Sequence, residues 1–252
     1  MRTIGIIGST GAIGKCLASY FKNENYIEAG RSLETSGNHI YLDLSDFRSV
    51  CDFINRISLE NIALLFLNSG TFEVKKYTID GYEYNFMVNA FSPYYIAKKI
   101  LSLKPNCRIV LTSSISILHA KQDLDPKHWK RIYRNTKLIE YLLFKELEKE
   151  FPNAICYAHP GIVPSKLSFG LHSKVIRGWI KHFGNTIESG TECLIQASTL
   201  SSCNSSWVSP SGFLSLRGKP KLKKLKLKKV LKEEIKQNIL KIEKELEEKY
   251  GI

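Results

Sequence analysis

Two side chains that could exchange a proton, Tyr133 and Lys137, stand four positions apart in a stretch with a helical pattern. Asp125 and Pro126 supply a capping residue and a first-turn proline, which predict a helix from about residue 126. A spacing of four places both side chains on one face of that helix. An ammonium group beside a phenol favours phenolate and lowers the pKa of the tyrosine, so a proton can be exchanged near neutral pH. The same spacing also occurs between ordinary surface residues.

A group of serines upstream could hold a substrate oxygen. The apolar segment 108–111 reads as a strand that runs on into serines, among them Ser114 and Ser116. Ligands of doubly wound sheets sit at the carboxyl ends of the strands, which is where these hydroxyls would lie. Serine, tyrosine and lysine together are a far more specific signal than any of them alone.

Three glycines, Gly8, Gly11 and Gly14, separate an apolar run at 2–7 from a helical pattern. A dinucleotide site needs such a loop, because the chain must turn tightly, approach a pyrophosphate closely and aim helix N–H groups at the anion. An ordinary strand-to-helix turn is the other interpretation. The order of strand, loop and helix favours the cofactor site.

The end of the second strand indicates which cofactor binds. Glu28 lies at about the separation expected for a ribose-binding carboxylate, but Gly30 and Arg31 occupy the strand end. A guanidinium there can pair with a 2′-phosphate through two hydrogen bonds. Lys15 could add a second positive charge, or it could be an ordinary surface residue. The sequence therefore predicts NADP(H).

Short apolar strands alternate with helical patterns over about 160 residues. This order predicts an α/β fold, a Rossmann-like doubly wound parallel sheet, in a single domain over 1–218. Residues 219–252 are predicted to form a Lys-rich helical extension, because leucines and isoleucines recur there at helical spacing. The further predicted strands are 26–29, 40–42, 62–67, 108–111, 154–158 and one within 207–216, and the predicted helices are 46–57, about 80–102, 126–149, 172–183 and 188–199.

Over about residues 2–216 the chain resembles the short-chain dehydrogenase/reductase family. The matching segments fall in the family's order, and the stretch from Tyr133 to Leu147 with His159-Pro160-Gly161 is most similar to the retinol-dehydrogenase-like branch. The matches are 8–14, Leu42-Asp43-Leu44, Leu67-Asn68-Ser69-Gly70, Val88-Asn89-Ala90, 109–114, Tyr133-x-x-x-Lys137 and His159-Pro160-Gly161.

The resemblance implies a role for each matching residue. Tyr133 would donate a proton to a carbonyl oxygen, Lys137 would lower the pKa of Tyr133 and bind the nicotinamide ribose, and Ser114 would bind the substrate oxygen, with Ser116 left open. Asn89 would anchor a water of a proton relay. The cofactor-binding residues implied are Gly8, Ser9, Thr10, Gly11, Ile13, Gly14, Arg31, Asp43, Leu44, Asn68, Ser69, Gly70, Tyr133, Lys137, Pro160, Gly161 and Val163.

The activity implied is an NADP(H)-dependent oxidoreductase that interconverts a carbonyl and an alcohol, as an NADPH-dependent carbonyl reductase would. The glycines follow a G-x-x-G-x-x-G pattern, and Ile7 stands where the family usually has threonine. If this pattern distorts the site, the alternative is a non-catalytic NADP(H)-binding regulatory or interaction protein on the same fold. The substrate would be set by the irregular segments 115–130 and 162–187.

Composition and charge limit the kinds of ligand and partner that the protein is expected to bind. The 252 residues carry a net charge of +13, and residues 217–252 alone hold 13 Lys and Arg against six Asp and Glu. The six scattered cysteines and six histidines have no metal-ligand spacing, which predicts reduced thiols, a cytoplasmic protein and no metal. We expect a small-molecule substrate and a homo-oligomer, dimer or tetramer, and no nucleic-acid partner. The basic extension could pack on the body or a partner subunit, touch an anionic membrane or attract an acidic substrate.

Overall fold

The computed structural model describes residues 2–32, 37–171, 174–203, 206–225 and 227–251. An eight-stranded sheet runs through its centre in the order β3-β2-β1-β4-β5-β6-β7-β8. Seven strands are parallel and β8 is antiparallel to β7. The strands are β1 Thr3–Ile7, β2 Tyr26–Gly30, β3 His39–Tyr41, β4 Ile62–Leu67, β5 Arg108–Thr112, β6 Ile155–Ala158, β7 Ser206–Pro210 and β8 Pro220–Lys224.

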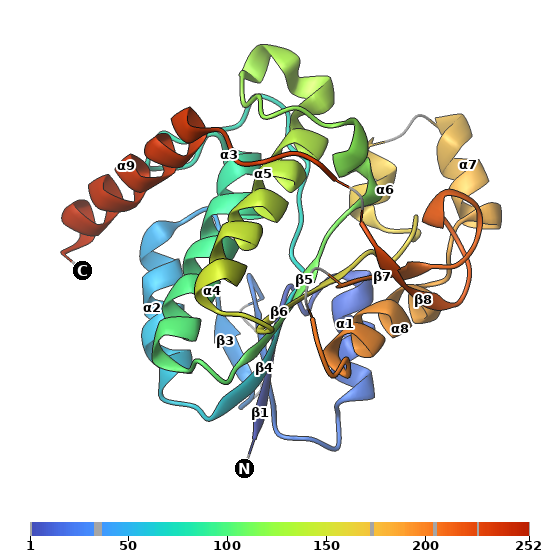
Figure 1. Ribbon diagram of the computed structural model, residues 1–252, viewed down its shortest axis with the longest axis horizontal. Helices are drawn as coiled ribbons and strands as arrows, with labels where there is room; N and C mark the ends of the chain where they lie inside the picture. Colours follow the sequence, from blue (N-terminus) through green and yellow to red (C-terminus); the bar gives the residue numbers. More distant parts are fainter. Residues whose placement is uncertain (1, 33–36, 172–173, 204–205, 226, 252) are drawn as a thin grey trace.

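Helices cover both faces of the sheet (Figure 1). On one side lie α2 (Phe47–Ser58), α4 (Ser92–Leu103) and α5 (Trp129–Glu150), and on the other lie α1 (Ala12–Tyr20) and α8 (Ile187–Ser198). One apolar core fills each side of the sheet. The Rossmann-like α/β prediction is confirmed.

The remaining helices lie nearer the carboxyl ends of the strands, apart from the C-terminal one. They are α3 (Tyr84–Phe86), which continues into a π-helical turn at Met87–Phe91, the 3₁₀ turns Ile115–His119, Pro126–His128 and Phe213–Ser215, and α6 (Lys166–Leu171), α7 (Lys174–Phe183) and α9 (Glu233–Tyr250). The prediction that Asp125 caps the helix with Tyr133 is wrong in detail, since Asp125 accepts from the Lys127 N–H at 2.8 Å in the 3₁₀ turn Pro126–His128, and α5 begins only at Trp129 after His128. The predicted helix at 172–183 begins at residues that lie outside the described part of the chain.

The prediction that a helix occupies the extension from residue 219 is wrong for its first part. Residues Pro220–Lys224 form β8, which pairs with the whole of β7, so the extension completes the sheet. The helix starts only at Glu233, after a connector that packs Leu225, Leu227 and Leu231 on the core. β8 is an edge strand and carries three lysines. Positive charge on an edge strand discourages pairing with another chain.

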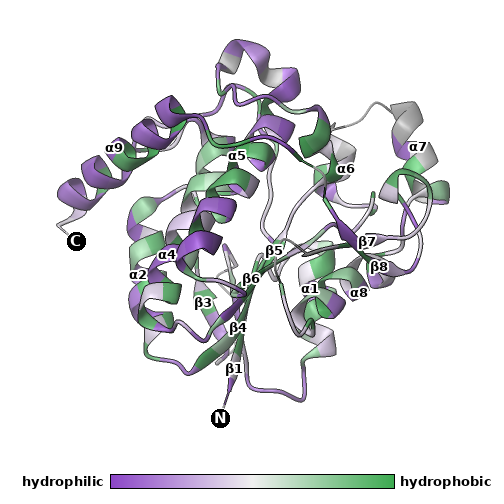
Figure 2. Cartoon of the chain, viewed as in Figure 1, coloured by the Kyte–Doolittle hydropathy of each residue, from purple (hydrophilic) through white to green (hydrophobic). Residues whose placement is uncertain are grey.

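α9 packs against the body of the protein. Ile239 and Leu246 are buried in the core on the α4 side, and Lys98 of α4 pairs with Glu243 at 2.6 Å. Residues 233–251 contain six Glu and four Lys, so the helix itself is not basic. Figure 2 shows α9 as largely hydrophilic with hydrophobic positions interspersed.

The cysteines differ from the prediction. Cys156 of β6 and Cys203 form a disulfide, with Cα atoms 4.8 Å apart and both residues buried. The other four are free thiols. The prediction of six reduced thiols is therefore wrong for this pair, and the argument from unpaired cysteines to a reducing compartment does not hold.

No helix in the described ranges is both long enough and apolar enough to cross a membrane.

We predict that Leu246→Ala lowers the free energy of unfolding by about 2–5 kcal/mol, because Leu246 is 1% exposed and its removal leaves a cavity under α9. Leu240→Ala on the same helix is the matched control. Leu240 is 43% exposed, so its loss should cost less than about 0.5 kcal/mol. Urea unfolding followed by circular dichroism measures both. Equal losses would show that α9 is not docked as described.

Candidate active site

The glycine loop joins β1 to α1 and has no room for a side chain at Gly8 or Gly14. Gly8 has φ +83°, a left-handed conformation that favours glycine, and a Cβ on it would lie 2.8 Å from the Ser69 hydroxyl. A Cβ on Gly14 would overlap the carbonyl oxygen of Gly8. A Cβ on Gly11 would meet only that same oxygen, at 3.4 Å. The loop is thus closed at Gly8 and Gly14 and open towards the surface at Gly11.

A cleft opens at the carboxyl ends of β1, β2 and β4, beside this loop. Nine of the sequence-predicted cofactor residues line it. These are Gly8, Thr10, Gly11, Arg31, Asp43, Leu44, Asn68, Ser69 and Gly70. Predicted residues outside its lining are Ser9, Ile13, Gly14, Tyr133, Lys137, Pro160, Gly161 and Val163.

Sequence reasoning missed Gly30, Leu42, Thr71, Tyr84 and Val88, which also line the cleft. Tyr84 is informative, since its hydroxyl accepts a hydrogen bond from Arg31 at 3.1 Å and Lys76 lies 4.0 Å from its ring centroid. Two cations therefore converge on one aromatic residue at the end of the cleft where β2 stops. Only the fold brings Lys76 and Tyr84 to Arg31, so no local sequence signal could have shown that these two residues belong to the cleft.

Asp43 and Asn68 are tied to the backbone around the cleft. One Asp43 oxygen accepts from the backbone N–H of Ser45 at 2.8 Å and from its hydroxyl at 2.7 Å. Asn68 donates to the carbonyl of Gly8 at 3.5 Å and accepts from the Thr112 hydroxyl at 3.2 Å. Asn68 thus connects the glycine loop to the end of β5.

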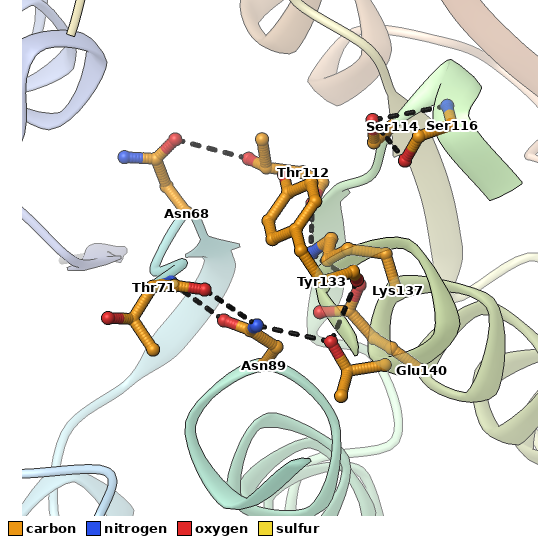
Figure 3. A network of polar contacts seen from close by, with 10 residues as sticks. Asn68, Thr71, Asn89, Thr112, Ser114, Ser116, Tyr133, Lys137 and Glu140 are labelled. Atoms are coloured by element: carbon orange, nitrogen blue, oxygen red, sulfur yellow. Dashed lines mark hydrogen bonds and ion pairs between the residues drawn. The ribbon is translucent and has the colours of Figure 1, made fainter. Parts of the chain in front are cut away.

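Asn89 lies in the π-helical turn between α3 and α4, an element often found at functional sites. Its amide oxygen accepts from the Thr71 N–H at 2.7 Å, and its NH₂ group donates to the Thr71 carbonyl at 2.9 Å and the Thr136 hydroxyl at 3.2 Å (Figure 3). Both amide protons are engaged by protein groups, and Asn89 joins the segment after β4 to α5.

Tyr133 and Lys137 lie side by side where β5 ends against α5, and Ser114 lies just beyond the end of β5 (Figure 3). Ser114 follows β5 and shares a hydrogen bond with the phenol of Tyr133. The Ser116 hydroxyl donates to Ser114 at 2.9 Å, from a 3₁₀ turn rather than from the strand. Of the two serines left open by the sequence, Ser114 contacts the tyrosine.

Lys137 is buried and bonded within the protein. Its ammonium donates to the backbone carbonyl of Thr112 at 2.8 Å and pairs with Glu140 at 2.5 Å. Glu140 is also buried, and the cost of burying its charge raises its pKa to about 7, although Lys137 opposes that rise. Sequence reasoning missed Glu140, yet its position three residues after Lys137 places it on the same helix face.

The pKa of Tyr133 is raised rather than lowered in this arrangement. Burial is the largest cause, the negative charge of Glu140 adds to it, and the hydrogen bond with Ser114 partly opposes it. The expected lowering by Lys137 is not among the causes, because the ammonium is directed at Thr112 and Glu140. Tyr133 is therefore a neutral phenol at physiological pH.

The loop after β6 carries three of the predicted cofactor residues and is packed against the segments at Asn185 and Leu216. Gly161 has φ +81°, and a Cβ there would lie 2.5 Å from the carbonyl oxygen of Leu216. Asn185 donates to the carbonyl of Pro160 at 2.8 Å. His159, at the start of this loop, is buried, which lowers its pKa to about 4 and keeps it neutral at physiological pH.

No protein-family model and no curated protein matches the sequence. Solved structures do match its fold. The ligand-free aldohexose dehydrogenase of Thermoplasma acidophilum is 18% identical with a TM-score of 0.59, over 78% of this chain and 86% of that one. A short-chain dehydrogenase from Sphingobium yanoikuyae in complex with NADPH is 16% identical with a TM-score of 0.60, over 78% and 83%. The NADPH-bound carbonyl reductase from chicken fatty liver is 16% identical with a TM-score of 0.56, over 82% and 96%.

At these identities the comparisons establish the fold. The chain has the α/β architecture of short-chain dehydrogenases, and its sequence-predicted site residues lie at the carboxyl ends of the strands, where doubly wound sheets bind ligands. The similarity to the retinol-dehydrogenase-like branch stays a prediction.

We predict that Gly14→Ala destabilises the protein by about 1–3 kcal/mol, because the added methyl group must displace the Gly8 carbonyl. Gly11→Ala is the control and should leave the unfolding free energy unchanged within about 0.5 kcal/mol. Thermal denaturation of the two variants beside the wild type compares them. A Gly14→Ala protein as stable as Gly11→Ala would contradict the described loop.

Proposed function

We propose that the protein is an NADP(H)-dependent oxidoreductase that interconverts a carbonyl and an alcohol. The observation that carries this proposal is the convergence of Ser114, Tyr133 and Lys137 at the end of β5, next to a cleft lined by the glycine loop. A dinucleotide in the cleft would extend from β2 towards β5, since Asn68 and Gly70 line the side nearer the tyrosine. Solved structures of the same fold include complexes with NADPH.

The proposed binding residues fit the parts of such a cofactor. The open backbone at Gly11 and the N-terminus of α1 suit a pyrophosphate. Arg31 is exposed at the end of β2, held by Tyr84, with Lys76 beside the same ring, so two cations can meet a 2′-phosphate. Asp43 and Leu44 would contact the adenine, and Pro160, Gly161 and Val163 would border the nicotinamide. Ser9, Ile13 and Gly14 would support the loop from within.

Bound NADPH would supply the hydride for reduction of the substrate carbon. Tyr133 would donate its hydroxyl proton to the carbonyl oxygen, and Ser114 would hydrogen-bond that oxygen and orient it. The raised pKa keeps Tyr133 protonated but also makes it a weaker acid, so proton donation would need a positive charge beside the phenolate as it forms. Lys137 would hold the nicotinamide ribose and supply positive charge to the developing phenolate.

Glu140 would regulate this proton transfer. Its ionised form holds Lys137 and opposes phenolate formation at Tyr133. Protonation or movement of Glu140 would release the ammonium towards the tyrosine and lower the pKa of Tyr133. Burial raises the pKa of Glu140 to about 7, so this change falls in the neutral range.

The competing function is binding of NADP(H) without turnover, by a regulatory or interaction protein. One observation favours it, namely that Lys137 is bonded to Glu140 and Thr112 rather than directed at Tyr133. The two functions differ in whether wild-type protein consumes NADPH with any member of a carbonyl panel. We further propose a cytoplasmic homo-oligomer, testable by sedimentation, with the substrate selected by 115–130 and 162–187.

We predict that Tyr133→Phe reduces turnover by at least about 100-fold, since the proton donor is lost. NADPH affinity should stay unchanged. Loss of NADPH absorbance with a carbonyl panel measures the first, and cofactor fluorescence the second. Tyr20→Phe is the control, because Tyr20 is 60% exposed on α1 and should be silent. Wild-type turnover in Tyr133→Phe would refute the mechanism.

We predict that Arg31→Ala weakens NADPH binding by about ten- to hundred-fold and leaves NADH binding nearly unchanged, because only NADPH carries a 2′-phosphate for the guanidinium. Titration calorimetry with both cofactors measures the ratio. Arg56→Ala, an exposed arginine of α2, should leave both affinities alone. Equal affinity of the wild type for the two cofactors would assign the choice to Glu28 or another group.

A further inference from the structure

A turn between β7 and β8 displays two large apolar side chains to solvent. Phe213 is 83% exposed and Leu214 is 64% exposed. The turn is closed by backbone hydrogen bonds, from Ser211 N–H to the Lys219 carbonyl at 2.9 Å and from Gly212 N–H to the Arg217 carbonyl at 3.0 Å. The two side chains are therefore held outward by a defined structure.

The turn also holds strained backbone. Leu214 has φ +49° and Ser215 has φ +56°, values that a bulky side chain such as leucine rarely adopts. Lys223 keeps Ser215 in place by donating to its hydroxyl and to the Pro210 carbonyl, each at 2.7 Å. A strained, well-anchored conformation that exposes apolar side chains suggests that they serve a contact outside the chain.

The region around the turn carries most of the molecule's net positive charge. Residues 160–232 contain 13 Lys and Arg and only two Glu, whereas the rest of the chain contains 24 Lys and Arg against 22 Asp and Glu. Arg217, Lys219, Lys221 and Lys224 are exposed on the turn and on β8, which is coloured hydrophilic in Figure 2. Leu222, between these lysines, is 48% exposed.

We propose that Phe213 and Leu214, with the cations of residues 217–224, form a docking surface for an anionic lipid bilayer. Aromatic and aliphatic side chains enter the boundary between headgroups and acyl chains, and neighbouring lysines pair with the anionic headgroups. Charge complementarity selects this occupant, because the region has almost no acidic groups to meet a cationic partner. The sequence suggested such a contact for the whole extension 219–252, but its helix α9 is packed on α4 and has more Glu than Lys.

The docking surface is fixed to the loop after β6, which the proposed function places beside the nicotinamide. The Leu216 carbonyl accepts from the Ile162 N–H at 3.0 Å, and the Gly218 N–H donates to Asn185 at 3.3 Å. Docking would therefore bring residues 160–163 close to the bilayer. If the proposed oxidoreductase function holds, its substrate is an apolar carbonyl or alcohol that enters from the lipid.

Vesicle sedimentation tests the surface without any enzyme assay, so it can fail independently of the proposed activity. The probe is unilamellar phosphatidylcholine vesicles containing about 30% phosphatidylserine, with pure phosphatidylcholine vesicles beside them. Full-length protein should bind the first and not the second. Phe213→Glu should weaken binding by at least about tenfold, and Lys219→Glu with Lys221→Glu by at least about 25-fold, near fivefold per cation.

Matched controls place the same changes elsewhere. Leu59 is 86% exposed, and Lys22 is also exposed. Both come just before a strand and so lie at the amino ends of the strands, whereas the turn follows the carboxyl end of β7. Leu59→Glu and Lys22→Glu should bind vesicles as the wild type does. Circular dichroism confirms that each variant is folded.

Three outcomes would overturn the proposal. The first is that wild-type protein does not bind the anionic vesicles. The second is that the control variants lose as much binding as the turn variants. The third is that a single-stranded RNA binds the protein instead of the vesicles. If Lys219→Glu with Lys221→Glu abolished that RNA binding and Phe213→Glu did not affect it, the cations would be assigned to nucleic acid.

Discussion

Lys137 and Glu140 face each other at 2.5 Å on α5, and their side chains are 3% and 1% exposed. A buried charge is costly without a partner, so each of these groups requires the other. The Thr112 carbonyl gives Lys137 a second partner and fixes α5 against the end of β5. This pair fixes the position of the ammonium, and the negative charge of Glu140 adds to the burial that raises the pKa of Tyr133.

The rest of the site is arranged around the same junction. Thr112 also donates to Asn68, which reaches the glycine loop, and Asn89 joins the segment after β4 to Thr136 on α5. The groups proposed for the cofactor and those proposed for proton transfer thus belong to one hydrogen-bonded network. The hydrogen bonds from Lys137 to Thr112 and from Thr112 to Asn68 connect α5 to the cleft through the end of β5.

The sequence predicted what depends on local pattern. The glycine spacing and the strand periodicity lie in short segments, and the structure places them as expected. The sequence could not predict features that depend on residues far apart in the chain. Lysine and leucine at helical spacing suited a helix at 220–224, but the free edge of β7 made it a strand. Likewise, only the fold brings Tyr84 to Arg31 and Cys203 to Cys156. Glu140 is the exception, since its spacing from Lys137 was visible and unused.

The Lys137–Glu140 pair controls the ionisation of Tyr133 in the proposed mechanism. NMR titration of protein labelled with ¹³C at the tyrosine Cζ tests this control without a substrate. The Tyr133→Phe spectrum assigns the signal. Glu140→Gln removes a negative charge that raises the pKa of Tyr133 and frees Lys137 to lower it. The account predicts that Tyr133 ionises at lower pH in Glu140→Gln than in the wild type. An unchanged or higher pKa would contradict it.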